Sequence, residues 1–210
     1  MTASAALHPG LWLAAAGVAA VFLRGRARQA VLLAAPLAAL AFLWALPDGP
    51  HGAWSFLGFE ATLVRLDNLS RLFATIFAVM AFAGALYALG QASRLEVPAA
   101  LVYAGSAIGA ALAGDLLTLF VFWELMAVGS TLVLWSAGPQ AFAASRRYLA
   151  MHLLGGVLLM AGIAGHVAAT GSIAFHLMRP DTVATALILA GFLLNAGAPP
   201  VSAWLPDAYP

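Results

Sequence analysis

The chain has 210 residues, of which 64% are apolar and 8% are charged, whereas a soluble globular domain has roughly 45–50% and about 25%. Too little polar surface remains to face water, so the composition predicts a protein whose solvent is the lipid bilayer. The net charge of +1 and the lack of a basic, aromatic-rich patch exclude nucleic acid as a partner, and the absence of cysteine excludes disulfides, thiol catalysis and thiolate metal sites.

Seven apolar stretches follow one another along the chain, and a spanning helix needs about 20 residues. We predict helices at residues 7–23, 30–46, 67–89, 97–113, 115–136, 147–169 and 182–198. The first stretch lacks a basic n-region and a small-residue cleavage site, so we expect a retained helix rather than a cleaved signal peptide. The predicted fold is an all-α, polytopic bundle of about seven transmembrane helices.

The only long polar connection, residues 47–66, is rich in proline and glycine, which disfavours a helix. We predict a short β-hairpin at the membrane interface, formed by Trp54, Phe56, Leu57, Phe59 and residues 61–64. Arginine counting then sets the orientation, because positive loops stay on the cytoplasmic side. An extracytoplasmic N-terminus and hairpin leave six arginines inside (Arg24, Arg26, Arg28, Arg94, Arg146, Arg147) and three outside (Arg65, Arg71, Arg179).

The last predicted helix is broken. Its apolar run meets Asn195, Pro199 and Pro200, and two adjacent prolines remove backbone donors and clash with the preceding turn. A break at membrane depth is tolerated only where protein or a water-filled cavity satisfies the freed carbonyls. Because the chain stops soon after this break, we expect a fragment of a longer protein.

Glu124 is the one carboxylate deep within a predicted helix. The others lie in loops or at helix ends, where solvent or the helix dipole accounts for them: Asp48, Glu60, Asp67, Glu96, Asp115, Asp181 and Asp207. Glu124 follows Asp115 by nine residues, about 14 Å along the helix and near the middle of a hydrocarbon core about 30 Å thick. An ionised group there costs about 2.5–3.5 kcal/mol, which indicates a functional site. The alternative is a protonated acid that hydrogen-bonds two helices together.

His152 is the second candidate for proton transfer, because it lies within a predicted helix and imidazole titrates near neutrality. The alternative is a histidine bonded to a backbone carbonyl between helices. Thr131, seven residues after Glu124, offers a hydroxyl on the same helix face that would hold water in a relay. No histidine pair has i, i+4 spacing, so we expect no metal site, and no cysteine or glycine-rich loop provides for a redox cofactor.

Two segments occur in order, DLLTLFVFWELM at residues 115–126 and WLPDAYP at residues 204–210. They resemble the antiporter-like proton-translocating subunits shared by respiratory complex I, membrane-bound hydrogenases and Mrp-type Na⁺/H⁺ antiporters. RYLAMHLLGG at residues 147–156 is similar to the D-type branch of the Mrp subunits in particular.

The resemblance implies about fourteen helices with two inverted five-helix repeats whose half-channels meet at the bilayer centre. This chain would be the N-terminal half, with three leading helices and the hairpin in residues 1–96 and most of the first repeat, truncated, in residues 97–210. In the family, a glutamate matching Glu124 pairs with a lysine of the seventh helix. Here Asn195 occupies that lysine position, and the chain contains no lysine.

The resemblance also implies a subunit of a hetero-oligomeric complex in the inner membrane of a bacterium. This subunit would move H⁺, and an exchange of H⁺ for Na⁺ stays open. Our hypothesis is that Glu124 and His152 titrate while Asn195 holds water on the broken helix. Two alternatives remain. One is a non-conducting scaffold for a redox or carbon-uptake complex, favoured by the amide of Asn195, which cannot titrate. The other is a non-redox membrane subunit of an NADH:quinone oxidoreductase-like or hydrogenase complex, with catalysis in other chains.

Overall fold

The computed structural model describes residues 8–56, 58–90, 93–200 and 202–208. Leu57 of the predicted hairpin and the last two residues of the WLPDAYP segment lie outside this part. The long helices are α1 (Pro9–Phe22), α2 (Gly25–Ala45), α3 (Asn68–Ala88), α4 (Glu96–Leu112), α5 (Leu116–Ser136), α6 (Phe142–Thr170) and α7 (Val183–Asn195). Short 3₁₀ turns at Pro139–Ala141 and Ser202–Trp204 and the four-residue helix α8 (Leu205–Ala208) complete the described helical elements.

All seven predicted helices are therefore present. Four of them, α2, α3, α5 and α6, are long and apolar enough to cross a membrane. The other three, α1, α4 and α7, are apolar but shorter, with 14, 17 and 13 residues. The outward faces of the helices are apolar, with large exposed side chains such as Phe22, Met80, Tyr87, Val157 and Val183, as expected where lipid replaces water.

Three predicted boundaries were wrong. Helix α2 begins at Gly25 rather than residue 30, and α6 begins at Phe142 rather than residue 147. Both extensions include arginines, which favour helix and can extend their charged ends to the interface. Helix α7 ends at Asn195 rather than residue 198, followed by Gly197 with φ of +67°, a left-handed conformation that suits glycine.

The predicted hairpin is confirmed and is longer than expected. Strand β1 (Gly49–Phe56) pairs antiparallel with β2 (Phe59–Leu66), so that Gly49 lies opposite Leu66 and Phe56 opposite Phe59. The residues of β1 are exposed or half-buried, whereas Ala61, Val64 and Leu66 of β2 are buried. Val64 and Leu66 pack into the core formed by the helices.

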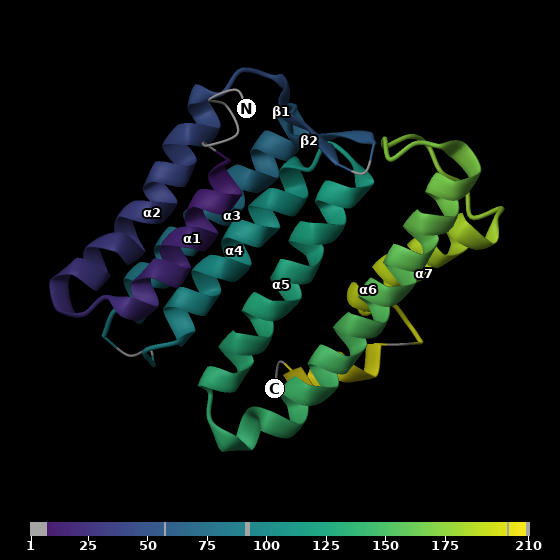
Figure 1. Cartoon of the computed structure of the whole chain (residues 1–210). Coiled ribbons are helices and arrows are strands. Elements are labelled where there is room, and N and C mark those ends of the chain that lie inside the picture. The colour runs from purple at the N-terminus through teal and green to yellow at the C-terminus, as the bar shows by residue number, and fades with distance from the viewer. Residues whose placement is uncertain (1–7, 57, 91–92, 201, 209–210) are drawn as a thin grey trace.

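Successive connections lie at alternating ends of the bundle (Figure 1). At one end, the Arg28 side chain donates to the Arg94 carbonyl over 2.8 Å, joining the first turn of α2 to the α3–α4 connection. At the other end, Gly114 N donates to the Thr62 carbonyl and Leu116 N to the Ile173 carbonyl, over 3.1 and 3.0 Å. The hairpin, the start of α5 and the α6–α7 connection therefore form one end of the molecule.

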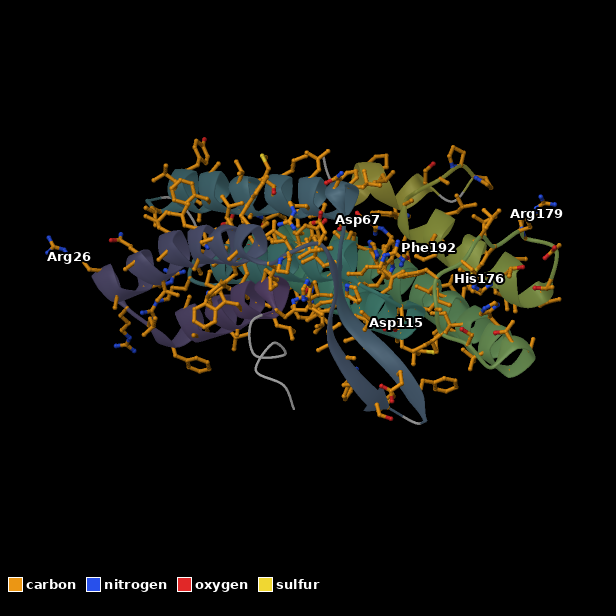
Figure 2. The ribbon with its side chains drawn as sticks, turned by 90° about the horizontal axis from the view of Figure 1, so that it is seen from above. Arg26, Asp67, Asp115, His176, Arg179 and Phe192 are labelled. Atoms are coloured by element: carbon orange, nitrogen blue, oxygen red, sulfur yellow. The ribbon has the colours of Figure 1, made fainter. Side chains whose placement is uncertain are left out.

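Asp115 holds this end together. Its buried carboxylate accepts hydrogen bonds from Thr118 N, Thr118 Oγ1 and Thr62 N over 2.8, 2.9 and 2.7 Å. It thus caps α5 and attaches the middle of β2, and its label lies beside the hairpin in Figure 2. Asp67 caps α3 in a similar way, and the Ser70 backbone N–H is the main cause that holds the pKa of its carboxyl below the ordinary value.

Helix α1 packs against α4 through glycine. A Cβ on Gly10 would overlap the Gly105 carbonyl and lie 2.7 Å from Gly109 N, and one on Gly105 would lie 2.6 Å from Ala14 N. Only glycine permits this backbone contact. Helices α6 and α7 make a second glycine contact, in which a Cβ on Gly162 would lie 2.6 Å from Ile188 N. These glycines therefore form the packing faces of α1, α4 and α6.

Candidate functional site

Glu124 lies near the midpoint of the 21-residue helix α5. Its side chain is partly buried, and its Oε1 atom is buried without a hydrogen-bond partner among the described residues. The two ion pairs found in the described part of the chain, Arg65–Asp67 and Arg71–Asp48, are both at the hairpin end. The helix thus carries its carboxylate well away from the solvated ends and from these paired arginines.

Two consecutive glycines of α6 make room for the polar side chains of α5 and α7. A Cβ on Gly156 would overlap Glu124 Oε1 and lie 3.0 Å from its Oε2, and one on Gly155 would overlap Asn195 Oδ1 and lie 2.9 Å from its Nδ2. Consecutive helical residues point about 100° apart. One glycine therefore faces α5 and the next faces α7, so the two polar side chains rest on adjacent residues of the same helix.

His152 lies one turn before this glycine pair and is 9% exposed. Aromatic rings enclose it: the centroid of Tyr148 is 4.1 Å away and that of Trp204 is 5.1 Å away. Its Nε2 atom is buried with no hydrogen-bond partner in the described part of the chain. The imidazole is therefore held by packing, with one nitrogen left for a molecule other than these side chains.

Asn195 is the last residue of α7, and its side chain is buried. Neither its Oδ1 nor its Nδ2 atom has a hydrogen-bond partner among the residues described. After Asn195 the chain turns and returns through the 3₁₀ turn Ser202–Trp204 to place Trp204 beside α6. The break in α7 thus positions both the amide and the indole at the site.

A cavity of about 190 Å³ lies between these helices. His152 and Asn195 line it, together with three residues of α5 close to Glu124, namely Trp123, Met126 and Ala127; Glu124 itself does not. The lining residues are Tyr103, Trp123, Met126, Ala127, Tyr148, His152, Asn195, Ala196, Trp204 and Leu205. The structure therefore places His152 and Asn195 in one cavity and Glu124 beside it, against Gly156.

The remaining predicted residues lie around this site. Thr131 is buried and its hydroxyl donates to the Ala127 carbonyl over 2.7 Å, and it is not a lining residue of the cavity. Its hydroxyl proton is thus occupied within its own helix. Pro199 and Pro200 follow α7 in the returning segment and also lie outside the lining; they end the helix rather than contact the site.

Sequence reasoning missed Tyr148, Ser130 and Trp204 as site residues. The Tyr148 hydroxyl donates to Ser130 Oγ over 2.8 Å, and the Ser130 hydroxyl donates to the Met126 carbonyl over 2.8 Å. Trp204 Nε1 is buried without a partner among the described residues. Two signals were available: Tyr148 lies one helical turn before His152, and Trp204 begins the WLPDAYP segment. Ser130 gave no signal, because it reaches the site through tertiary packing.

Comparison with known proteins relates the chain to membrane subunits of antiporters. Residues 113–210 match the family model described as NADH:quinone oxidoreductase/Mrp antiporter, transmembrane. A probable K⁺/H⁺ antiporter D-type subunit of Rhizobium meliloti is 30% identical over 161 residues, covering 69% of this chain and 30% of that protein. An uncharacterized protein of Mycobacterium tuberculosis is 32% identical over 172 residues, covering 76% and 27%. The chain thus spans less than a third of the length of these relatives.

Solved structures share the fold. A chain of the archaeal membrane-bound sulfane sulfur reductase has a TM-score of 0.80 and 28% identity, with 96% of this chain and 36% of that chain covered. A chain of the Mrp complex from Dietzia sp. DQ12-45-1b has a TM-score of 0.77 and 25% identity, with 96% and 24% covered. The chain, with its family match on residues 113–210, belongs to the antiporter-like membrane subunits that complex I and Mrp antiporters share.

Proposed function

We propose that this chain is the proton-conducting part of a membrane subunit that moves H⁺ within a larger assembly, and that Glu124 and His152 are the groups that load and release the proton. Residues 1–96 would carry the three leading helices, and residues 97–210 most of the first inverted repeat of a fold of about fourteen helices. Asn195 would hold the water that joins the two titrating groups. The ion exchanged for H⁺, where there is one, would be Na⁺ or K⁺, as in the names of the relatives.

The observation that carries this proposal is the concentration of unpaired polar atoms in an apolar bundle. Glu124 Oε1, His152 Nε2, both amide atoms of Asn195 and Trp204 Nε1 are buried without partners among the described residues. Each such atom costs about 1–3 kcal/mol if it stays unpaired. Water relieves this cost where a cavity is polar and roomy enough, and about 30 Å³ holds one water molecule. The cavity of about 190 Å³ beside these atoms therefore suits a short water chain.

Such a chain would give the proton a route past Asn195. The amide cannot titrate, but it can accept a hydrogen bond through Oδ1 and donate one through Nδ2. It would therefore orient water between the carboxylate on α5 and the imidazole on α6. Both groups keep a buried atom free for that water, and imidazole can accept a proton on one nitrogen while it releases another.

Replacing His152 by alanine tests its role. We expect proton flux to fall roughly tenfold, because general acid–base groups contribute at least this much, while water in the enlarged cavity keeps a residual path open. The measurement is lumenal pH change in vesicles that contain the full-length protein with its partner subunits. His51→Ala, at the half-buried histidine whose Nε2 lies 2.8 Å from the Pro47 carbonyl oxygen in the hairpin, is the matched control. Equal flux in both variants and the native protein would count against the role of His152.

A non-conducting scaffold is the second candidate, favoured by Asn195 because an amide replaces a titratable group. Proton flux in vesicles that contain the full-length protein distinguishes the two candidates. A scaffold gives no flux, so the native protein and Glu124→Gln would then both show none. Co-purifying subunits define the assembly, since iron–sulfur or flavin subunits indicate a respiratory or hydrogenase complex and small membrane subunits alone indicate an Mrp-like antiporter.

We also propose that the hairpin end faces the extracytoplasmic side. The end that bears Arg28 and Arg94 would then be cytoplasmic, following the excess of arginine there. Because the chain has no cysteine, single-cysteine variants report the side directly. We expect Ser55→Cys in the hairpin to react with a membrane-impermeant maleimide in intact cells and Ser93→Cys to react only after permeabilisation. The reverse pattern would invert the orientation.

A further inference from the structure

Two histidines far from the cavity meet at the hairpin end of the molecule. His166 lies in the last turns of α6 and is buried, and His176 lies exposed in the connection from α6 to α7. Their ring centroids are 4.8 Å apart, with an angle of 34° between the ring planes. Figure 2 shows His176 at the α6–α7 side of the molecule, on the same side as Arg179. Neither histidine takes part in the site described above.

Hydrogen bonds assign the proton on each ring. His176 Nδ1 lies 3.1 Å from the Ala174 carbonyl oxygen, which only accepts, so Nδ1 carries the proton and Nε2 carries a lone pair. His166 Nε2 lies 3.4 Å from Thr170 Oγ1, whose own proton is donated to the His166 carbonyl over 2.8 Å. His166 Nε2 is therefore the donor, and its Nδ1 carries the lone pair. An N–H donated to the protein with the other nitrogen free is the usual state of a metal-binding histidine.

The spacing of the rings also suits a shared ion. With a Zn–N bond of about 2.0–2.1 Å and a ring centroid roughly 1.1 Å behind its nitrogen, two imidazoles on one tetrahedral ion have centroids about 5 Å apart. The observed 4.8 Å lies near this value. Imidazole nitrogen is also a preferred ligand of Zn²⁺, Cu²⁺ and Ni²⁺, whereas Mg²⁺ and Ca²⁺ prefer oxygen.

We propose that His166 and His176 form a binding site for a divalent transition-metal ion of the Zn²⁺ class. No group of three or more His, Cys, Asp or Glu side chains that could hold a metal occurs in the described part of the chain. Water therefore completes the coordination, and the ion stays exchangeable. Because protons compete for the same lone pairs, binding weakens as the pH falls.

Such an ion would join the α6–α7 connection to α6. The same connection pairs with the start of α5, through Leu116 N and the Ile173 carbonyl and through the bridge between Asp115 and Ala174. A bound ion would therefore fasten α5, α6 and the α6–α7 connection together at the hairpin end. The site contains neither Glu124 nor His152, so it does not depend on proton transport.

Zinc titration of the full-length protein, purified without a histidine tag, tests the proposal. A competing fluorescent zinc indicator should report one site per chain that weakens by at least about tenfold in His176→Gln, since even an outer partner of a metal ligand is worth about 10–100-fold. His176 is exposed, so this variant is expected to fold, and His166→Gln should weaken binding similarly. Co²⁺ in place of Zn²⁺ should give a visible absorption band in the native protein that is lost in both variants.

His51→Gln is the matched control, because its histidine is half-buried in the hairpin and belongs to no histidine pair in the described residues. It should keep the affinity of the native protein. Zinc affinity unchanged in His176→Gln, or reduced equally in His51→Gln, would overturn the proposal.

Discussion

Replacing Glu124 by glutamine is expected to abolish proton flux, with a loss of roughly 100-fold or more. Glutamine has nearly the same shape and still fits against Gly156, so the packing of α5 on α6 is kept. It cannot bind and release a proton, however, and the buried Oε1 position then offers only an amide. The measurement is lumenal acidification in vesicles that contain the full-length protein and its partner subunits.

Glu60→Gln is the matched control, since Glu60 is exposed in β2 and lies in the hairpin. It should transport protons like the native protein. Glu124→Asp should retain part of the activity, because it keeps the titrating group but withdraws it by one methylene. Undiminished flux in Glu124→Gln would remove Glu124 from the mechanism, and no flux in the native protein would favour the scaffold instead.

Replacing Gly156 by alanine is expected to reduce flux by roughly tenfold or more without touching a titrating group. The added Cβ overlaps Glu124 Oε1, so the carboxylate must move. The carboxylate is the flexible end of its side chain, so it can shift at little cost in stability, but a displacement of about 1 Å at a reacting group can cost about 100-fold in rate. Flux and thermal unfolding, measured on the same preparation, separate displacement of the carboxylate from loss of the fold.

Two further glycines serve as comparisons. Gly155→Ala should instead displace Asn195, whose Oδ1 the new Cβ would overlap. Gly84→Ala in α3 places its Cβ in open space. This variant should keep the native flux and should not lower the thermal stability, because alanine favours helix more than glycine does. Wild-type flux in a folded Gly156→Ala variant would contradict the proposal that proton transfer depends on the close fit of Glu124 against α6.

Much of the fold could be predicted because lipid as solvent makes helices nearly obligatory. The apolar runs located all seven helices, and the proline- and glycine-rich residues 47–66 located the hairpin. Errors occurred at the ends of helices, as at Gly25 and Phe142, where arginines and polar residues continue a helix beyond its apolar run. Hydropathy locates the apolar run of a helix but not the residue at which the helix begins or ends in the polar region beside the membrane.

The candidate site was predictable only one residue at a time. Glu124 was identified by its depth in a helix and His152 by its chemistry, because each is unusual within an apolar run. Tyr148, Ser130 and Trp204 were missed as site residues, since neither a position in a helix nor a place in a family segment shows which side chains pack beside a site and which face lipid. The pairing of His166 with His176 was invisible for the same reason: ten residues separate them, and no helical spacing joins them.

The sequence by itself determined that this chain folds in a membrane, how many helices it forms and which of them carries a carboxylate at mid-length, because these properties follow from composition and from rise per residue. Only the tertiary structure decided that adjacent glycines of α6 receive Glu124 and Asn195, and that His152 shares a cavity with the broken end of α7. The physical reason is that close helix contacts depend on the small size of a few residues and on where their neighbours lie, which no periodicity along a single chain records.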